Sequence, residues 1–183
     1  MEALNLNRKY TYADILAWPE DERWELMDGV PYLMAQPNVA HERISREVFI
    51  QLANFLKGKS CEVFDALGVK LIADDDKTYL VPDITVICDK SKLADGKTCI
   101  GAPDMVMEIT SPSTLMHDRL RKFNKYLQAG VREYWIVDPE SKTVSVHTME
   151  NGKYVVDAYG ETDTVPVQAL EGCAISLPDV FSV

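Results

Sequence analysis

The strongest constraint on the fold is a pair of apolar segments that flank one amphipathic helix. Residues 104–111 read DMVMEITS and residues 133–139 read EYWIVDP. Such nearly continuous apolar runs are typical of strands with both faces covered. The segment between them, from about Leu115 to Ala129, has helical periodicity, and its expected core face carries Met116, Leu120, Phe123 and Leu127. The order strand, helix, strand predicts a parallel βαβ crossover inside a mixed sheet.

Further elements are predicted on both sides of this unit. Thr11 is a plausible N-cap for a short helix, and a longer amphipathic helix is expected from about Ala40 to Lys57. Asp28-Gly29 between apolar flanks indicates a β-hairpin, and so does Asn151-Gly152 between two alternating segments. Strands are also expected at 64–73 and within 74–89. The chain is therefore interpreted as one α/β domain over residues 1–183, with a mixed sheet, flanking helices and added hairpins.

Composition agrees with a globular domain. Hydrophobic residues make up 46% and charged residues 26% of the 183 residues, which are ordinary values for a soluble protein. No apolar run reaches the roughly 20 residues that span a bilayer, and the first residues lack the apolar core of a signal peptide. We therefore expect a cytoplasmic protein with no membrane partner. The four cysteines include no C-x-x-C pair and are expected to be reduced thiols.

The net charge is −10. This value argues against broad electrostatic attraction to nucleic acid, because phosphate binding needs clustered lysine and arginine. It leaves room for a local basic patch and for carboxylates that bind a divalent metal.

Three carboxylates stand in apolar strand contexts. Glu25 lies in RWELMDG, Asp83 in LVPDITV and Glu108 in MVMEITS. One such acid is readily explained by an edge position or a basic partner, but three together are harder to explain in that way. If neighbouring strands bring Asp83 and Glu108 side by side, their charges repel unless a cation lies between them. Mg²⁺ is the natural candidate because it prefers oxygen ligands and retains waters.

The order of these motifs resembles the PD-(D/E)XK nuclease superfamily, which has the restriction-endonuclease-like fold. The resemblance rests on Pro82-Asp83, a later strand with Glu108, and a helix that bears Lys122. More closely, the chain resembles a bacterial family of proposed restriction endonucleases, formerly a domain family of unknown function. That likeness covers roughly Tyr10 to Phe181. Its most specific part is EITSPST followed by D-x-x-x-K-x-x-x-Y and EYWIVDP.

The resemblance implies a metal-dependent site for phosphodiester cleavage. Asp83 and Glu108 would bind Mg²⁺ or Mn²⁺, and Glu25 would be a helper acid. Lys122 would be the electrostatic group, and Tyr126 a supporting hydrogen-bond donor. Such a site needs a nucleophilic water and stabilisation of the extra negative charge, which a metal ion and a nearby ammonium group can supply.

The chain departs from the superfamily pattern at one position. The lysine that usually stands two residues after the second acid is replaced by Thr110, and Lys122 on the following helix would take its place. Without the resemblance, Lys122 is typical of a solvated helix lysine and Tyr126 of a core-boundary residue. His41 is typical of a helix-end histidine, which the resemblance makes a possible neighbour of the site. Arg119 and Arg121 either bind phosphate or pair with surface acids.

The leading hypothesis is a Mg²⁺-dependent endonuclease that hydrolyses phosphodiester bonds in nucleic acid. DNA is the expected substrate, although the residues do not distinguish DNA from RNA or fix a sequence specificity. A homodimer is expected, since dimerisation could assemble a basic groove. One alternative is a non-catalytic binding or interaction module of the same fold. Another is a metal-dependent hydrolase of a small phosphorylated molecule.

Overall fold

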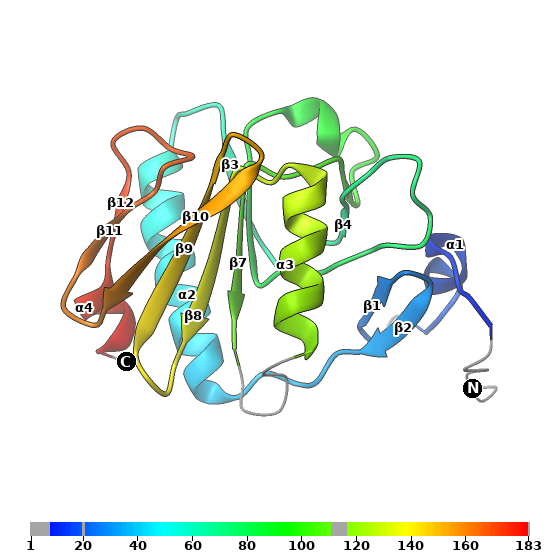
Figure 1. Ribbon diagram of the computed structural model, residues 1–183, viewed down its shortest axis with the longest axis horizontal. Coiled ribbons are helices and arrows are strands. Elements are labelled where there is room, and N and C mark those ends of the chain that lie inside the picture. Colours follow the sequence, from blue (N-terminus) through cyan, green and yellow to red (C-terminus); the bar gives the residue numbers. More distant parts are fainter. Residues whose placement is uncertain (1–7, 20, 111–116, 183) are drawn as a thin grey trace.

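The computed structural model describes residues 8–19, 21–110 and 117–182. A six-stranded mixed sheet forms its centre (Figure 1). In spatial order its strands are β10 (Lys153–Gly160), β9 (Thr143–Glu150), β8 (Glu133–Asp138), β7 (Met105–Ile109), β5 (Ile84–Ile87) and β3 (Glu62–Asp65). β7 and β8 run parallel, and the other neighbours in the sheet are antiparallel. The predicted mixed α/β class is confirmed.

The predicted βαβ crossover is present. Helix α3 (His117–Ala129) connects β7 to β8, and the two strands pair from Met105 with Glu133 to Ile109 with Val137. Helix α3 covers one face of the sheet, while α2 (Val39–Leu56) and α4 (Leu177–Phe181) cover the other (Figure 1). Both faces are therefore covered, which explains why β7 is nearly continuously apolar.

Each face of the sheet has its own hydrophobic core. On the α2 side the buried side chains include Ile44, Val48 and Leu52, which are spaced by four and pack in one cluster with Trp135. On the α3 side the buried cluster includes Val106 and Tyr134. Side chains alternate between the faces along a strand, so Glu108 lies on the same face as Val106, under α3.

The buried face of α3 differs from the predicted one. Leu120 was expected in the core and is 67% exposed, whereas Lys122 is 9% exposed and Tyr126 is fully buried. Phe123 packs at the margin of the core, and Met116 lies outside the described residues. The helix turns a lysine and a tyrosine inward because Glu108 beneath it needs polar partners.

Smaller elements surround the sheet. Thr11 caps α1 through a capping box with Asp14, as predicted. The predicted hairpin at Asp28-Gly29 is also present, and both turn residues take the positive φ that a tight hairpin turn needs. The remaining bounds are α1 (Tyr12–Leu16), β1 (Trp24–Met27), β2 (Val30–Leu33), β4 (Val69–Lys70), the 3₁₀ helix η1 (Lys90–Leu93), β6 (Cys99–Ile100), β11 (Thr164–Pro166) and β12 (Ala174–Ser176).

The region between residues 64 and 89 is more broken than its sequence suggests. The predicted strand over residues 64–73 is interrupted after Asp65, because Ala66 has a φ of 48°. Within residues 74–89, regular strand structure is confined to β5, and Tyr79 and Leu80 form only isolated bridges. Pro82 lies between these bridges and β5, where a residue without an N–H interrupts strand pairing. Among the described residues, no helix is long and apolar enough to cross a membrane.

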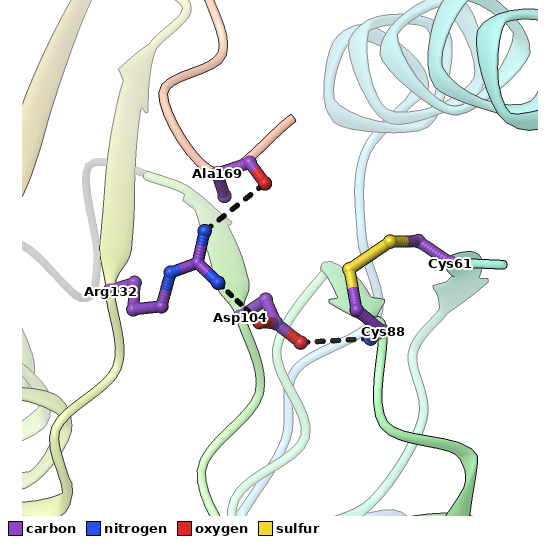
Figure 2. Close-up of a disulfide and its surroundings, with 5 residues drawn as sticks. All are labelled: Cys61, Cys88, Asp104, Arg132 and Ala169. Carbon is purple, nitrogen blue, oxygen red and sulfur yellow. Dashed lines mark hydrogen bonds and ion pairs between the residues drawn. A yellow bond between two sulfur atoms is a disulfide. The ribbon is translucent and has the colours of Figure 1, made fainter. Parts of the chain in front are cut away.

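Cys61 and Cys88 form a disulfide, so the prediction of reduced thiols is wrong for this pair (Figure 2). Cys61 directly precedes Glu62 and Cys88 directly follows Ile87, so the two cysteines lie just beyond the Glu62–Ile87 pair at one end of the β3–β5 ladder. The spacing of the cysteines does not predict this disulfide, because residues 27 positions apart come into contact here only through the pairing of β3 with β5. Cys99 and Cys173 are free and buried.

A polar network continues from the disulfide. The N–H of Cys88 donates to Asp104 Oδ2 at 2.8 Å, and Arg132 Nη1 donates to Asp104 Oδ1 at 3.0 Å (Figure 2). Arg132 Nη2 also donates to the carbonyl of Ala169 at 3.2 Å. The network therefore ties the end of β5 to the start of β8 and to the segment before β12.

Removal of the disulfide should destabilise the fold. We expect the double substitution Cys61→Ser and Cys88→Ser to lower the free energy of unfolding by about 2–4 kcal/mol, since the bridge restricts the unfolded chain. Urea denaturation would measure this loss. Dithiothreitol should destabilise the wild type by a similar amount and leave the double variant unchanged. Equal stability of both proteins under oxidising conditions would contradict the prediction.

Candidate active site

A buried lysine joins acids from two separate strands. Lys122 Nζ on α3 lies 3.0 Å from both carboxylate oxygens of Glu108 on β7, and 2.8 Å from Glu25 Oε1 on β1. Tyr126, one turn further along α3, donates its hydroxyl to Glu108 Oε1 at 2.6 Å. Glu25 Oε1 also accepts the N–H of Val81 at 2.9 Å. Both acids are thus held in place by fixed donors.

The charges in this cluster shift one another's pKa values. Burial raises the pKa of Glu108 to about 7; Lys122 opposes this shift, and the carboxylates of Glu25 and Asp83 add to it. Burial lowers the pKa of Lys122, but Glu108 and Glu25 outweigh burial and raise it overall. Burial and the charge of Glu108 raise the pKa of Tyr126. At neutral pH, Lys122 is therefore an ammonium group and Tyr126 remains a hydrogen-bond donor.

Asp83 and Glu108 line the same pocket. The last pair of the β5–β7 ladder joins Ile84 to Met107, and Asp83 and Glu108 are the residues directly beyond that pair. Asp83 Oδ2 accepts the N–H of Ile109 at 2.6 Å. The negative charges of these two acids repel each other, which is one reason for the raised pKa of Glu108.

His41 belongs to the same site. Its Nε2 lies 3.1 Å from Asp83 Oδ1, at the start of α2. Burial lowers the pKa of His41, but the hydrogen bond and charge of Asp83 raise it overall. His41 Nδ1 is buried and has no hydrogen-bond partner among the described residues. The sequence allowed two interpretations of His41, a helix-end histidine or a neighbour of the site. The structure fits the second interpretation.

These groups line one pocket of about 460 Å³. Its charged walls include residues that sequence reasoning missed, namely Arg23, Glu42 and Asp65. Burial and the charges of Glu42 and Asp83 raise the pKa of Asp65. Its apolar wall is the connection from β2 to α2, with Met34 and Pro37. Carboxylates and apolar side chains thus both line the pocket.

The carboxylates suit a metal that needs few protein ligands. Among the described residues, no group of three or more His, Cys, Asp and Glu side chains is arranged as a complete metal site. Asp83 and Glu108 nevertheless face the same pocket from adjacent strands, and a cation would relieve their repulsion. Mg²⁺ is commonly held by one or two carboxylates together with waters and substrate phosphates. The oxygen donors present fit that ion.

The structure brings the predicted residues together: Glu25, Asp83, Glu108 and Lys122 line the pocket, and Tyr126 supports Glu108 from below it. Thr110 supplies no charge, and its hydroxyl donates to the carbonyl of Val137 at 3.1 Å. The guanidinium of Arg121 donates to the hydroxyl of Tyr32, and the side chain of Arg119 lies outside the described part of the chain. Among the pocket residues that the sequence did not indicate, Glu42 is the one that could have been inferred, because it directly follows His41.

Loss of the Lys122 ammonium should destabilise the protein, and more strongly at high pH. The folded-state pKa of Glu108, about 7, lies above its ordinary value. The folded protein therefore binds the extra proton between those two values, and the contribution of Glu108 to stability falls as pH rises through that window. In Lys122→Met at pH 8, the carboxylates lose their partner, and we expect a loss of about 3–5 kcal/mol. At pH 5 the loss should be smaller, because Glu108 is protonated.

Urea denaturation at the two pH values would measure this difference. Lys125→Met is a matched control on the same helix, since its Nζ pairs with the exposed Asp28. We expect it to cost less than about 1 kcal/mol at either pH. Equal effects of the two substitutions would contradict the proposed importance of the buried ammonium group.

Comparisons with known proteins place the whole chain among related proteins. Residues 12–178 match a family model described as "Uma2: Putative restriction endonuclease". An uncharacterized protein from Synechocystis sp. is 28% identical over 168 residues, which cover 88% of this chain and 86% of that protein. A crystal structure from Anabaena variabilis, described as "a putative nuclease belonging to DUF820", aligns with a TM-score of 0.76 and 23% identity. That alignment covers 94% of this chain and 97% of the other. The restriction-endonuclease-like fold class is thereby confirmed.

Proposed function

The chain belongs to the Uma2 family, and on that premise we propose that it is a divalent-metal-dependent endonuclease that hydrolyses phosphodiester bonds in DNA. The observation that carries the proposal is the arrangement around Glu108. Its carboxylate lies in the same pocket as Asp83, which directly precedes β5, and the ammonium group of Lys122 lies 3.0 Å away. Two acids and one fixed cation facing a pocket are the groups that this reaction needs.

The roles of the residues follow from their contacts. Asp83 and Glu108 would hold Mg²⁺ or Mn²⁺, which when bound lowers the pKa of a water and neutralises phosphate charge. Lys122 stabilises negative charge as it develops on the phosphate, because its position is fixed by Glu25 and Glu108 before substrate arrives. Tyr126 orients the carboxylate of Glu108. Glu25 acts through Lys122 as a positioning residue.

The substrate must be attracted locally. The net charge of −10 provides no general attraction to a polyanion. Within the pocket, Arg23 and Lys122 supply positive charge beside the acids. A divalent ion on Asp83 and Glu108 would offset part of the remaining negative charge, so binding of nucleic acid should depend on the metal.

Asp83→Asn should abolish cleavage. We expect the wild type to cut DNA in the presence of Mg²⁺ or Mn²⁺ and to lose activity with EDTA. Loss of a ligand should lower the rate by at least about 100-fold, since even partners of metal ligands contribute 10–100-fold. Assays on plasmid, single-stranded DNA and RNA would measure the rate and test the preference for DNA. Glu140→Gln, an exposed acid outside the pocket, is the matched control. Undiminished cleavage by Asp83→Asn would overturn the assignment of the site.

Metal binding can be tested without activity. Mg²⁺ or Mn²⁺ should raise the melting temperature of the wild type, because a ligand that binds only the folded state stabilises it. Glu108→Gln should remove this shift, while Glu140→Gln should retain it. No shift in the wild type, together with no cleavage of any nucleic acid, would favour the alternative of a non-catalytic interaction module.

A further inference from the structure

Strand β10 is an edge of the central sheet with an open outer side. It pairs with β9 along eight residues, and within the described part of the chain no strand pairs with its other side (Figure 1). Val155 is 46% exposed and Val156, on the opposite face of the sheet, is 57% exposed. Natural sheets rarely leave a long edge of this kind unprotected, since it is a template for pairing with another strand.

The hairpin turn determines which backbone groups point outward. Asn151 and Gly152 form a two-residue turn, so Glu150 and Lys153 exchange the first hydrogen bonds between β9 and β10. Hydrogen-bonded pairs alternate along an antiparallel ladder. The N–H and C=O groups that point away from β9 are therefore those at the alternating positions Tyr154, Val156, Ala158 and Gly160.

Gly160 provides an independent check of this alternation. Its N–H donates to Asp163 Oδ2 at 2.7 Å, and its C=O accepts the N–H of Asp163 at 3.0 Å. Both groups therefore point away from β9, as the turn geometry requires. The outward groups of Tyr154, Val156 and Ala158 have no backbone partner among the described residues.

We propose that the occupant of this edge is a second copy of the chain, whose own β10 pairs with it in antiparallel orientation. A two-fold axis would then join the two sheets into one. In the register argued below, the interface would satisfy the outward backbone groups of Tyr154 and Val156, and it would cover Val155 and Val156 on the two faces.

Charged side chains distinguish between the possible registers of the two β10 strands. Hydrogen bonding through the outward groups allows the two-fold axis to pass at Val155, at Val156 or at Asp157. An axis at Asp157 places two carboxylates opposite each other, and an axis at Val156 places Asp157 opposite Val155. An axis at Val155 instead places Lys153 of each copy opposite Asp157 of the other. Within the described residues, neither Lys153 nor Asp157 has an ion-pair partner of its own. Both are therefore available to pair across the interface, and this register is electrostatically complementary.

The proposed interface is separate from the candidate active site. β9 and β8 lie between β10 and β7, which carries Glu108. Dimerisation would leave the active-site pocket of each copy uncovered, and no interface residue lines that pocket. The inference therefore does not depend on the proposed nuclease activity, and its failure would leave that activity untouched.

Sedimentation of the full chain from micromolar to millimolar concentration tests the dimer. We expect concentration-dependent dimerisation in the wild type and at least a tenfold weaker association in Val156→Pro. That substitution removes an outward N–H and leaves the hydrogen bonds to β9 in place. Circular dichroism and thermal melting would confirm that the variant is folded; if it is not, Val156→Lys replaces it. A wild type that is monomeric throughout, or a dimer that a folded variant retains, would overturn the proposal.

Crosslinking tests the register. Val155→Cys places two thiols on the two-fold axis in a non-hydrogen-bonded pair, where the Cα atoms are about 4.5 Å apart and a disulfide can form. We expect a covalent dimer on mild oxidation, and none from Ile72→Cys, whose parent side chain is 50% exposed. Lys153→Glu and Asp157→Lys should each weaken association, and their combination should restore it. Stronger crosslinking through Val156→Cys, or no rescue by the double variant, would overturn this register.

Discussion

The buried ammonium group of Lys122 satisfies charges that the interior could not otherwise hold. Glu108 lies in the middle of an apolar strand and Glu25 at the start of a peripheral hairpin, and both depend on the same Nζ atom. An unpaired carboxylate in this position would be expensive. The interaction also fixes α3 over β7 and holds the β1–β2 hairpin against the sheet. A single side chain thus links the candidate site to the packing of α3 and of the β1–β2 hairpin.

The same cluster gives the site an excess of negative charge. Five acids line the pocket, while Lys122 and Arg23 provide the nearby permanent positive charge. Burial and, to a lesser extent, the neighbouring carboxylates raise the pKa values of Glu108 and Asp65. An arrangement of this kind is costly for a fold and useful for binding cations, since strain of this type is concentrated where proteins bind ligands.

Much of the framework could be predicted from sequence because its signals are local. The continuous apolar run of β7 indicated a strand with both faces covered, and helical spacing indicated α2 and α3. The sequence offered the meeting of Asp83 and Glu108 only on the condition that their strands are neighbours, whereas Lys122 came from the family resemblance. Helical periodicity alone predicted Leu120 in the core. Periodicity cannot show that a buried acid, Glu108, turns Lys122 inward instead. Asp65 and the Cys61–Cys88 pair depend on the register of β3 with β5, which no local pattern encodes.

The disulfide has a consequence for the geometry of the pocket. It closes one end of the short β3–β5 ladder, while Asp65 and Asp83 stand at the other end. β3 is the outermost strand on that side of the sheet, and its pairing with β5 spans only four residues. In a reducing compartment this strand would lose its covalent anchor, and fraying would then displace Asp65 before any residue on β7. The oxidation state of two sulfur atoms would thereby set how firmly one wall of the acidic pocket is held.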